Sequence, residues 1–236
     1  LVRAGRKVAI CEQVEDPAVA KGIVKREVIR IISSGTFFDD ASDARYIVAL
    51  CPSGGTKTAS SRSTQGGFGV AFIDNAAGTI HTNVIPTSSA AIEILSKLPV
   101  AECVFPEGAE AAVQALFMHP LMTMRNVPLT RFRDWSFAVD RARQTLLEHF
   151  GTQSLRGFGI EEIPAAQAAA GGLLEYLRDM HKRPLQHIDR IALYDDSDYV
   201  FISPAAHHGL EMESLFKNLD HTVTAMGRRL LHFWLY

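Results

Sequence analysis

Apolar residues gather in short runs between Tyr46 and Phe132, and each run has the length of a β-strand. The runs are rich in β-branched and aromatic residues and are bounded by polar or glycine-containing stretches, a pattern that predicts strands. The predicted strands are Tyr46–Cys51, Phe68–Asp74, Thr79–Ile85, Ala101–Phe105 and Asn126–Phe132. We expect the last of them at a sheet edge, because Pro128 has no amide hydrogen to donate to a ladder.

Helical spacing appears between and after these runs. Ala138, Ala142, Leu146 and Phe150, for example, recur at intervals that place them on one face of a helix. The predicted helices are Ser88–Leu98, Glu107–Phe117, Ser136–Phe150 and Pro164–Lys182. Three meandering strands followed by alternating helices and strands predict an α/β fold: a mixed five-stranded sheet with helices, in a ribonuclease-H-like layout. The small residues of Ala168–Gly172 are expected to allow close packing of the last helix.

Two smaller sections flank this domain. Before it, Lys7–Cys11 and Ile23–Ile32 predict strands, and Asp16-Pro17 predicts the start of a short helix that ends at Gly22. These elements are too few to bury a core alone, so they indicate part of a further α/β domain.

After Pro184, strand-like pieces within Leu193–Ile202 precede helices over Leu210–Leu219 and Thr222–Leu235, with Asp220 expected as an N-cap. This section is typical of the start of a helical domain. The predicted boundaries are 1–35, a polar linker over 36–45, a central domain over 46–183 and a last section over 184–236. Pro52–Gly67 is expected to be a long hairpin loop.

Composition excludes several classes of protein. The 236 residues carry a net charge of -2, so there is no overall basic surface for nucleic acid. The chain has three cysteines (Cys11, Cys51 and Cys103) that lie far apart and form no C-x-x-C pair, which argues against a disulfide framework and a structural zinc site. No apolar run is long enough to cross a membrane, and a reducing cytoplasm is the expected compartment.

Asp74 is the residue that most invites a catalytic interpretation. It ends a predicted strand, the place where nucleases with a ribonuclease-H-like fold hold the first ligand of a metal pair. Such chemistry needs several more carboxylates close by. The acidic residues available in the equivalent regions are Glu102, Glu107, Asp134 and Asp140, and none shows paired spacing. A turn residue is the simpler interpretation of Asp74, and a metal-dependent nuclease is kept as the alternative function.

Other candidate sites are weaker still. Gly54-Gly55-Thr56-Lys57-Thr58 lacks the spacing of a phosphate-binding loop, so we predict no nucleotide site there. His207 and His208 are adjacent, and neither they nor His221 or His232 have cysteine or carboxylate neighbours at ligand spacing. We therefore predict no catalytic residue and no metal site, and no cofactor in this chain.

Two segments near the ends of the chain, Gly5–Pro17 and Leu219–Trp234, resemble the MutS family of bacterial DNA mismatch-repair proteins. Leu219 to Trp234 reads Leu-Asp-His-Thr-Val-Thr-Ala-Met-Gly-Arg-Arg-Leu-Leu-His-Phe-Trp, which is similar to the start of the family's lever and core region. Gly5 to Gln13, followed by Glu15-Asp16-Pro17, is similar to the end of its mismatch-recognition domain. Ser34-Gly35-Thr36 stands where the family has Pro-Gly-Thr before its connector domain.

The resemblance implies an internal segment of such a protein: the end of the recognition domain, the connector and the start of the core. A full-length protein of this kind is expected to bind mismatched duplex DNA as a homodimer and to use ATP and Mg at a site downstream of Tyr236. The resemblance further implies a connector that relays conformational change and docks a MutL-type partner. The aromatic residue and glutamate that contact a mismatch in the family are expected upstream of Leu1.

Two points stay open at this level. Ser203–Glu211 departs from the family's Asp-x-x-Thr-Arg-Arg-Asn-Leu-Glu, so no role of those family side chains is carried over to this chain. Lys25, Arg26 and Arg30 are basic residues that could face DNA phosphates or form the solvated face of a strand.

Overall fold

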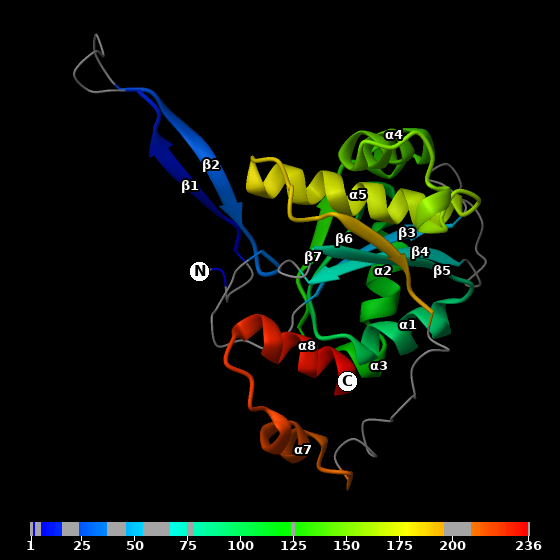
Figure 1. Ribbon diagram of the computed structural model, residues 1–236. Helices are drawn as coiled ribbons and strands as arrows, with labels where there is room; N and C mark the ends of the chain where they lie inside the picture. Colours follow the sequence, from blue (N-terminus) through cyan, green and yellow to red (C-terminus); the bar gives the residue numbers. More distant parts are fainter. Residues whose placement is uncertain are drawn as a thin grey trace.

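The computed structural model describes Val2 and residues 6–15, 24–36, 46–53, 67–74, 78–123, 126–195 and 209–235. Its centre is a six-stranded sheet with helices on both faces (Figure 1). A separate two-stranded antiparallel ribbon of β1 (Val8–Gln13) and β2 (Arg26–Ile32) extends away from this body. No helix in the described part of the chain is long and apolar enough to cross a membrane.

The strand order of the sheet is β7-β6-β3-β4-β5-β8. Its strands are β3 (Tyr46–Pro52), β4 (Phe68–Asp74), β5 (Thr79–Ile85), β6 (Val100–Pro106), β7 (Leu129–Phe132) and β8 (Arg190–Leu193). β3, β4 and β5 form an antiparallel meander, whereas β6, β7 and β8 join in parallel. β7 lies at one edge, as Pro128 predicts.

The expectation of five strands is wrong, because β8 adds a sixth beside β5, with Thr79 opposite Arg190. β8 lies beyond residue 183, where the sequence pattern indicated the end of the central domain. It has only four residues, with the burial pattern exposed, buried, intermediate, exposed, so it has too little alternation to stand out in the sequence.

Helices cover the two faces unequally. On one face lie α4 (Val139–Phe150) and α5 (Pro164–His181), and on the other lie α1 (Ser88–Lys97), α2 (Glu110–Phe117) and α3 (Pro120–Thr123) (Figure 1). Short 3-10 turns precede α2 at Glu107–Ala109 and α4 at Asp134–Phe137, and another spans Arg156–Phe158. α5 is the central covering helix, and most of its residues are buried.

Close approach explains the small residues of α5. A Cβ placed on Gly171 would lie 2.5 Å from the Cβ of Ala142 in α4, so the two helices pack almost backbone to backbone. The packing interpretation of Ala168–Gly172 is confirmed, since all five residues are buried.

After the sheet, the described chain continues into α7 (Met212–Leu219) and α8 (Ala225–Leu235), close to the expected helices. Asp220 is not the N-cap of α8. Its carboxylate accepts from the amide and hydroxyl of Thr222, while the Thr224 hydroxyl accepts from the amide of Gly227 and so caps the helix. The predicted helix after Asp16-Pro17 and most of the loop Pro52–Gly67 lie outside the described residues.

Candidate functional site

Glu102 is a buried carboxylate within the sheet, on the strand next to the edge strand β7. It lies in β6, where apolar residues occupy both faces, and its side chain is 1% exposed. Alternation along the strand places it on the same face as Val104, toward α5, and opposite Cys103 and Phe105. A carboxylate in such a place is costly unless donors surround it.

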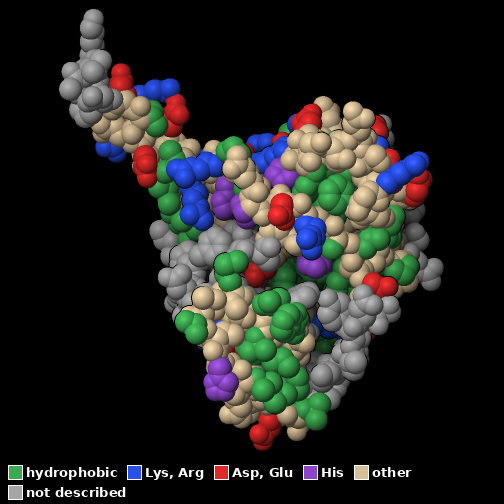
Figure 2. Space-filling view, viewed as in Figure 1, with side chains coloured by type: hydrophobic (Ala, Val, Ile, Leu, Met, Phe, Trp, Pro, Cys, Tyr) green, Lys and Arg blue, Asp and Glu red, His purple; other side chains and the backbone are tan. Residues whose placement is uncertain are grey.

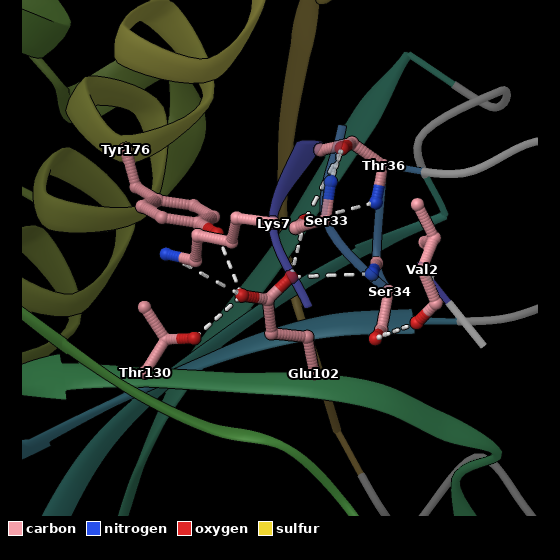
Figure 3. Close-up of polar contacts among 9 residues, drawn as sticks. Val2, Lys7, Ser33, Ser34, Thr36, Glu102, Thr130 and Tyr176 are labelled. Atoms are coloured by element: carbon pink, nitrogen blue, oxygen red, sulfur yellow. Dashed lines mark hydrogen bonds and ion pairs between the residues drawn. The ribbon is translucent and has the colours of Figure 1, made fainter. Parts of the chain in front are cut away.

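One carboxylate oxygen faces the turn that follows the ribbon. Oε2 accepts hydrogen bonds from the Ser33 hydroxyl at 2.5 Å and from the Gly35 amide at 3.1 Å (Figure 3). The turn is closed by a second set of bonds, because the Ser33 amide donates to the Thr36 hydroxyl at 2.7 Å. Ser33 and Thr36 are buried although both side chains are polar.

The other carboxylate oxygen faces the body of the domain. Oε1 accepts from the Thr130 hydroxyl of β7 and the Tyr176 hydroxyl of α5, each at 2.6 Å. Burial raises the pKa of Tyr176 far above its usual value, and the charge and hydrogen bond of Glu102 raise it further. Tyr176 therefore remains a protonated donor, and it also packs edge-on against Phe132 at 5.3 Å.

Lys7 completes the cluster from the start of the ribbon. Its ammonium lies 4.0 Å from Oε1 of Glu102 and 5.0 Å from the centre of the Tyr176 ring. Burial lowers the pKa of Lys7, while the charges of Glu102 and Asp179 act in the opposite direction. We call Lys7, Ser33, Gly35, Glu102, Thr130 and Tyr176 the Glu102 junction.

The chemistry of the junction is that of a structural joint. A carboxylate that accepts four hydrogen bonds in a desolvated place has its lone pairs occupied, so it is held in one geometry. A cavity of about 400 Å³ lies elsewhere, between α2, α3 and β7. Its lining contains no ionisable side chain; the residues are Gln114, Phe117, Met118, Met122, Thr123, Asn126, Val127 and Leu129.

The carboxylates considered for a metal pair are not brought together. Asp74 shares the sheet face of Phe72, whereas Glu102 lies on the opposite face. Asp134 accepts the Gly108 amide at 2.9 Å, and Glu107 and Asp140 lie exposed in the first turns of their helices. Among the described residues, no three His, Cys, Asp or Glu side chains are grouped to hold a metal ion. This arrangement does not favour the nuclease alternative.

The remaining candidates are equally dispersed. His232 packs against the Phe216 ring of α7 at 5.4 Å, and His221 lies exposed in the turn before α8. His207, His208 and the loop Gly54–Thr58 lie outside the described residues.

Lys25, Arg26 and Arg30 were the candidates for contact with DNA phosphates, and two of them face the solvent. Lys25 forms an ion pair with Glu27 at 2.5 Å, and Arg26 is exposed. Arg30 instead turns toward the junction, where its Nη2 donates to the Thr36 carbonyl at 3.5 Å.

Sequence reasoning considered Glu102 only as a possible partner of Asp74. A signal for its real place was present, because Val100–Pro106 is an apolar strand on both faces and Glu102 is its one charged residue. Such strands are buried on both sides, so this carboxylate needs internal donors. The sequence did not indicate which residues supply these donors, since Ser33 and Tyr176 are far from Glu102 along the chain.

The cysteines lead to a testable expectation. Cys11 is exposed, whereas burial raises the pKa of Cys51 to about 12, with a smaller effect from the charge of Asp134, and raises the pKa of Cys103 further. Thiolates are the reactive species, so we expect one rapidly alkylated thiol in the folded chain at pH 8, namely Cys11. Mass spectrometry after brief iodoacetamide treatment measures this. Equal labelling of all three in the folded chain would contradict the burial of Cys51 and Cys103.

Comparison with known proteins places these features in a family. Residues 1–41 match the family model described as MutS domain I, and residues 45–189 match MutS domain II. DNA mismatch repair proteins MutS from Desulfatibacillum aliphaticivorans and Symbiobacterium thermophilum are each 34% identical to the whole chain, which spans 26% and 27% of their respective lengths. The Glu102 junction lies where the two matched regions meet. The chain belongs to the MutS family of DNA mismatch-repair proteins.

Proposed function

We propose that the chain acts as the connector region of a mismatch-repair sensor. In this proposal the sheet and its helices form a ribonuclease-H-like connector, the ribbon belongs to the end of the mismatch-recognition domain, and α7 and α8 begin the core. In this proposal the full-length protein binds mismatched duplex DNA as a homodimer and hydrolyses ATP with Mg, as the resemblance of the two end segments to the family implies. The relatives' printed name, DNA mismatch repair protein, supports the repair role.

The Glu102 junction is the observation that carries the proposal. A connector that relays movement needs a stiff joint to the domain beside it. Here one carboxylate binds the turn after β2 through Ser33 and Gly35 and binds β7 and α5 through Thr130 and Tyr176. Because each contact has one defined geometry, a displacement of the ribbon is transmitted to the sheet.

The last helices support the part of the proposal that concerns the core. Hydrophobic side chains gather over α7 and α8 in Figure 2. The exposed ones include Leu215, Leu219, Val223, Met226, Leu230 and Trp234. Exposed apolar surface of this kind is typical of an interface, and we infer that the remainder of a helical core covers it in the full-length protein.

A binding experiment with this chain tests the proposed role. We expect it to bind a MutL-type protein and to bind duplex DNA only weakly, whether the duplex is mismatched or perfectly paired. The reason is that its net charge is -2 and that Lys25, a candidate for phosphate contact, is already paired with Glu27. Biolayer interferometry with the three ligands in parallel measures this.

Two results would contradict the proposal. Tight and mismatch-selective DNA binding by the chain would show that it contains the recognition surface. Absence of binding to the MutL-type protein, in a preparation whose circular dichroism shows a folded sheet, would remove the docking role from this region.

A further inference from the structure

Among the described residues, the β1–β2 ribbon contacts the body near its base. Figure 1 shows β1 and β2 extending away from the sheet, and the outer parts of both strands are exposed. An isolated two-stranded ribbon has little stability of its own. Its direction must therefore be set by contacts at the base, which involve Lys7, Ile31 and the turn Ser33–Thr36.

The donors to the two carboxylate oxygens of Glu102 differ in how firmly the rest of the fold holds them. Thr130 and Tyr176 are held independently of Glu102, because β7 pairs with β6 and Tyr176 lies fully buried in α5 against Phe132. The turn Ser33–Thr36 itself belongs to no strand or helix, and the end of β2 beside it packs on the body through Ile31. We therefore expect loss of the carboxylate to leave Thr130 and Tyr176 in place and to release the turn Ser33–Thr36.

The turn fits against Glu102 with no spare room. A Cβ on Gly35 would lie 2.5 Å from Cγ1 of Ile47 and 3.0 Å from Oε2 of Glu102. The backbone of Gly35 thus approaches the sheet more closely than any other residue type allows. This contact gives a way to remove the turn from Glu102 without changing a residue of the sheet.

We propose that Glu102 is a positioning residue that fixes the direction of the β1–β2 ribbon relative to the sheet, through its bonds to Ser33 and Gly35. When these bonds are lost, the ribbon changes direction or becomes free to swing while the sheet and its helices stay folded. This inference goes beyond the proposed function, because it concerns a contact within the chain and holds whether or not the chain binds a partner.

Pulsed electron paramagnetic resonance can test it with one native label site. Cys11 is exposed on β1, whereas Cys51 and Cys103 are buried and poorly reactive. A second nitroxide is attached through Gln144→Cys on the exposed side of α4. We expect one narrow distribution of the distance between the two nitroxides in the labelled chain. In the Gly35→Ala variant we expect this distribution to broaden or its mean to shift.

Matched controls separate positioning from general damage. Gly157→Ala should keep the native distance, because a Cβ there meets nothing within 4 Å. Thr130→Val should also keep it, since this change removes a donor from Oε1 and leaves Oε2 bound to Ser33 and Gly35. Glu102→Ala should broaden the distance distribution, and Glu102→Gln should largely keep it narrow. The glutamine amide oxygen can still accept from the Gly35 amide, while the glutamine NH2 group donates to the hydroxyls of Thr130 and Tyr176.

The experiment has outcomes that would contradict the proposed role of Glu102. Two results would overturn it. One is an unchanged, narrow distribution of the nitroxide–nitroxide distance in Gly35→Ala, and the other is a broad distribution in the labelled chain that carries Gln144→Cys alone. Should Gly35→Ala fail to fold, Ser33→Ala takes its place, because it removes only one hydroxyl. Broadening in that variant supports the proposal, and a distance distribution of native width overturns it.

Discussion

Replacing Glu102 with alanine is expected to lower the free energy of unfolding by about 3–5 kcal/mol, as when one partner of a buried charged network is removed. Four donors converge on this carboxylate: the hydroxyls of Ser33, Thr130 and Tyr176 and the amide of Gly35. Each buried donor left unpaired costs about 1–3 kcal/mol. The hydroxyls can turn toward other acceptors, but the amide cannot, so the costs do not simply add. Urea unfolding followed by circular dichroism at pH 7 measures the change.

Glu93→Ala is the matched control. Its carboxylate pairs with Lys97 at 3.2 Å on the exposed side of α1, one helical turn apart. Exposed pairs of this type contribute only about 0.3–0.5 kcal/mol. A loss for Glu102→Ala no larger than that of the control would show that the junction does not stabilise the fold.

The short apolar runs of the sequence were enough to predict most of the sheet. β3 to β6 are buried along nearly all their length or alternate clearly, so their limits are close to the predicted ones. β8 was missed because four residues carry almost no periodic signal. Its position follows from long-range pairing with β5, which a local pattern does not contain.

The site shows the same division between local and distant information. The apolar surroundings of Glu102 in β6 are visible in the sequence and indicate a buried carboxylate. Its partners come from segments 69 positions before it, at Ser33, and 74 after it, at Tyr176. Only the fold selects these donors among the many hydroxyls of the chain. Asp74 drew attention by its place at a strand end, but the face on which it lies separates it from Glu102.

The second large effect is expected at Gly171. A Cβ there would lie 2.5 Å from Cβ, 2.6 Å from Cα and 2.7 Å from the carbonyl oxygen of Ala142. Valine adds two further carbons in a place with no room, so α5 and α4 must separate. Overpacking of a close-packed interior costs about 1–3 kcal/mol, and we expect Gly171→Val at the upper end, about 3 kcal/mol. Thermal and urea unfolding beside Gly157→Ala, whose Cβ has open space, measures it.

A companion variant distinguishes backbone contact from side-chain crowding. If the Ala142 methyl group alone caused the clash, Gly171→Val combined with Ala142→Gly would regain most of the lost stability. Two of the three short distances are to backbone atoms of Ala142, so we expect little recovery. Full recovery would contradict the backbone contact. α5 packs directly on β3, β4 and β5, whereas α4 packs on α5, so we expect the separation to displace α4 and to leave the Tyr176 hydroxyl bound to Glu102.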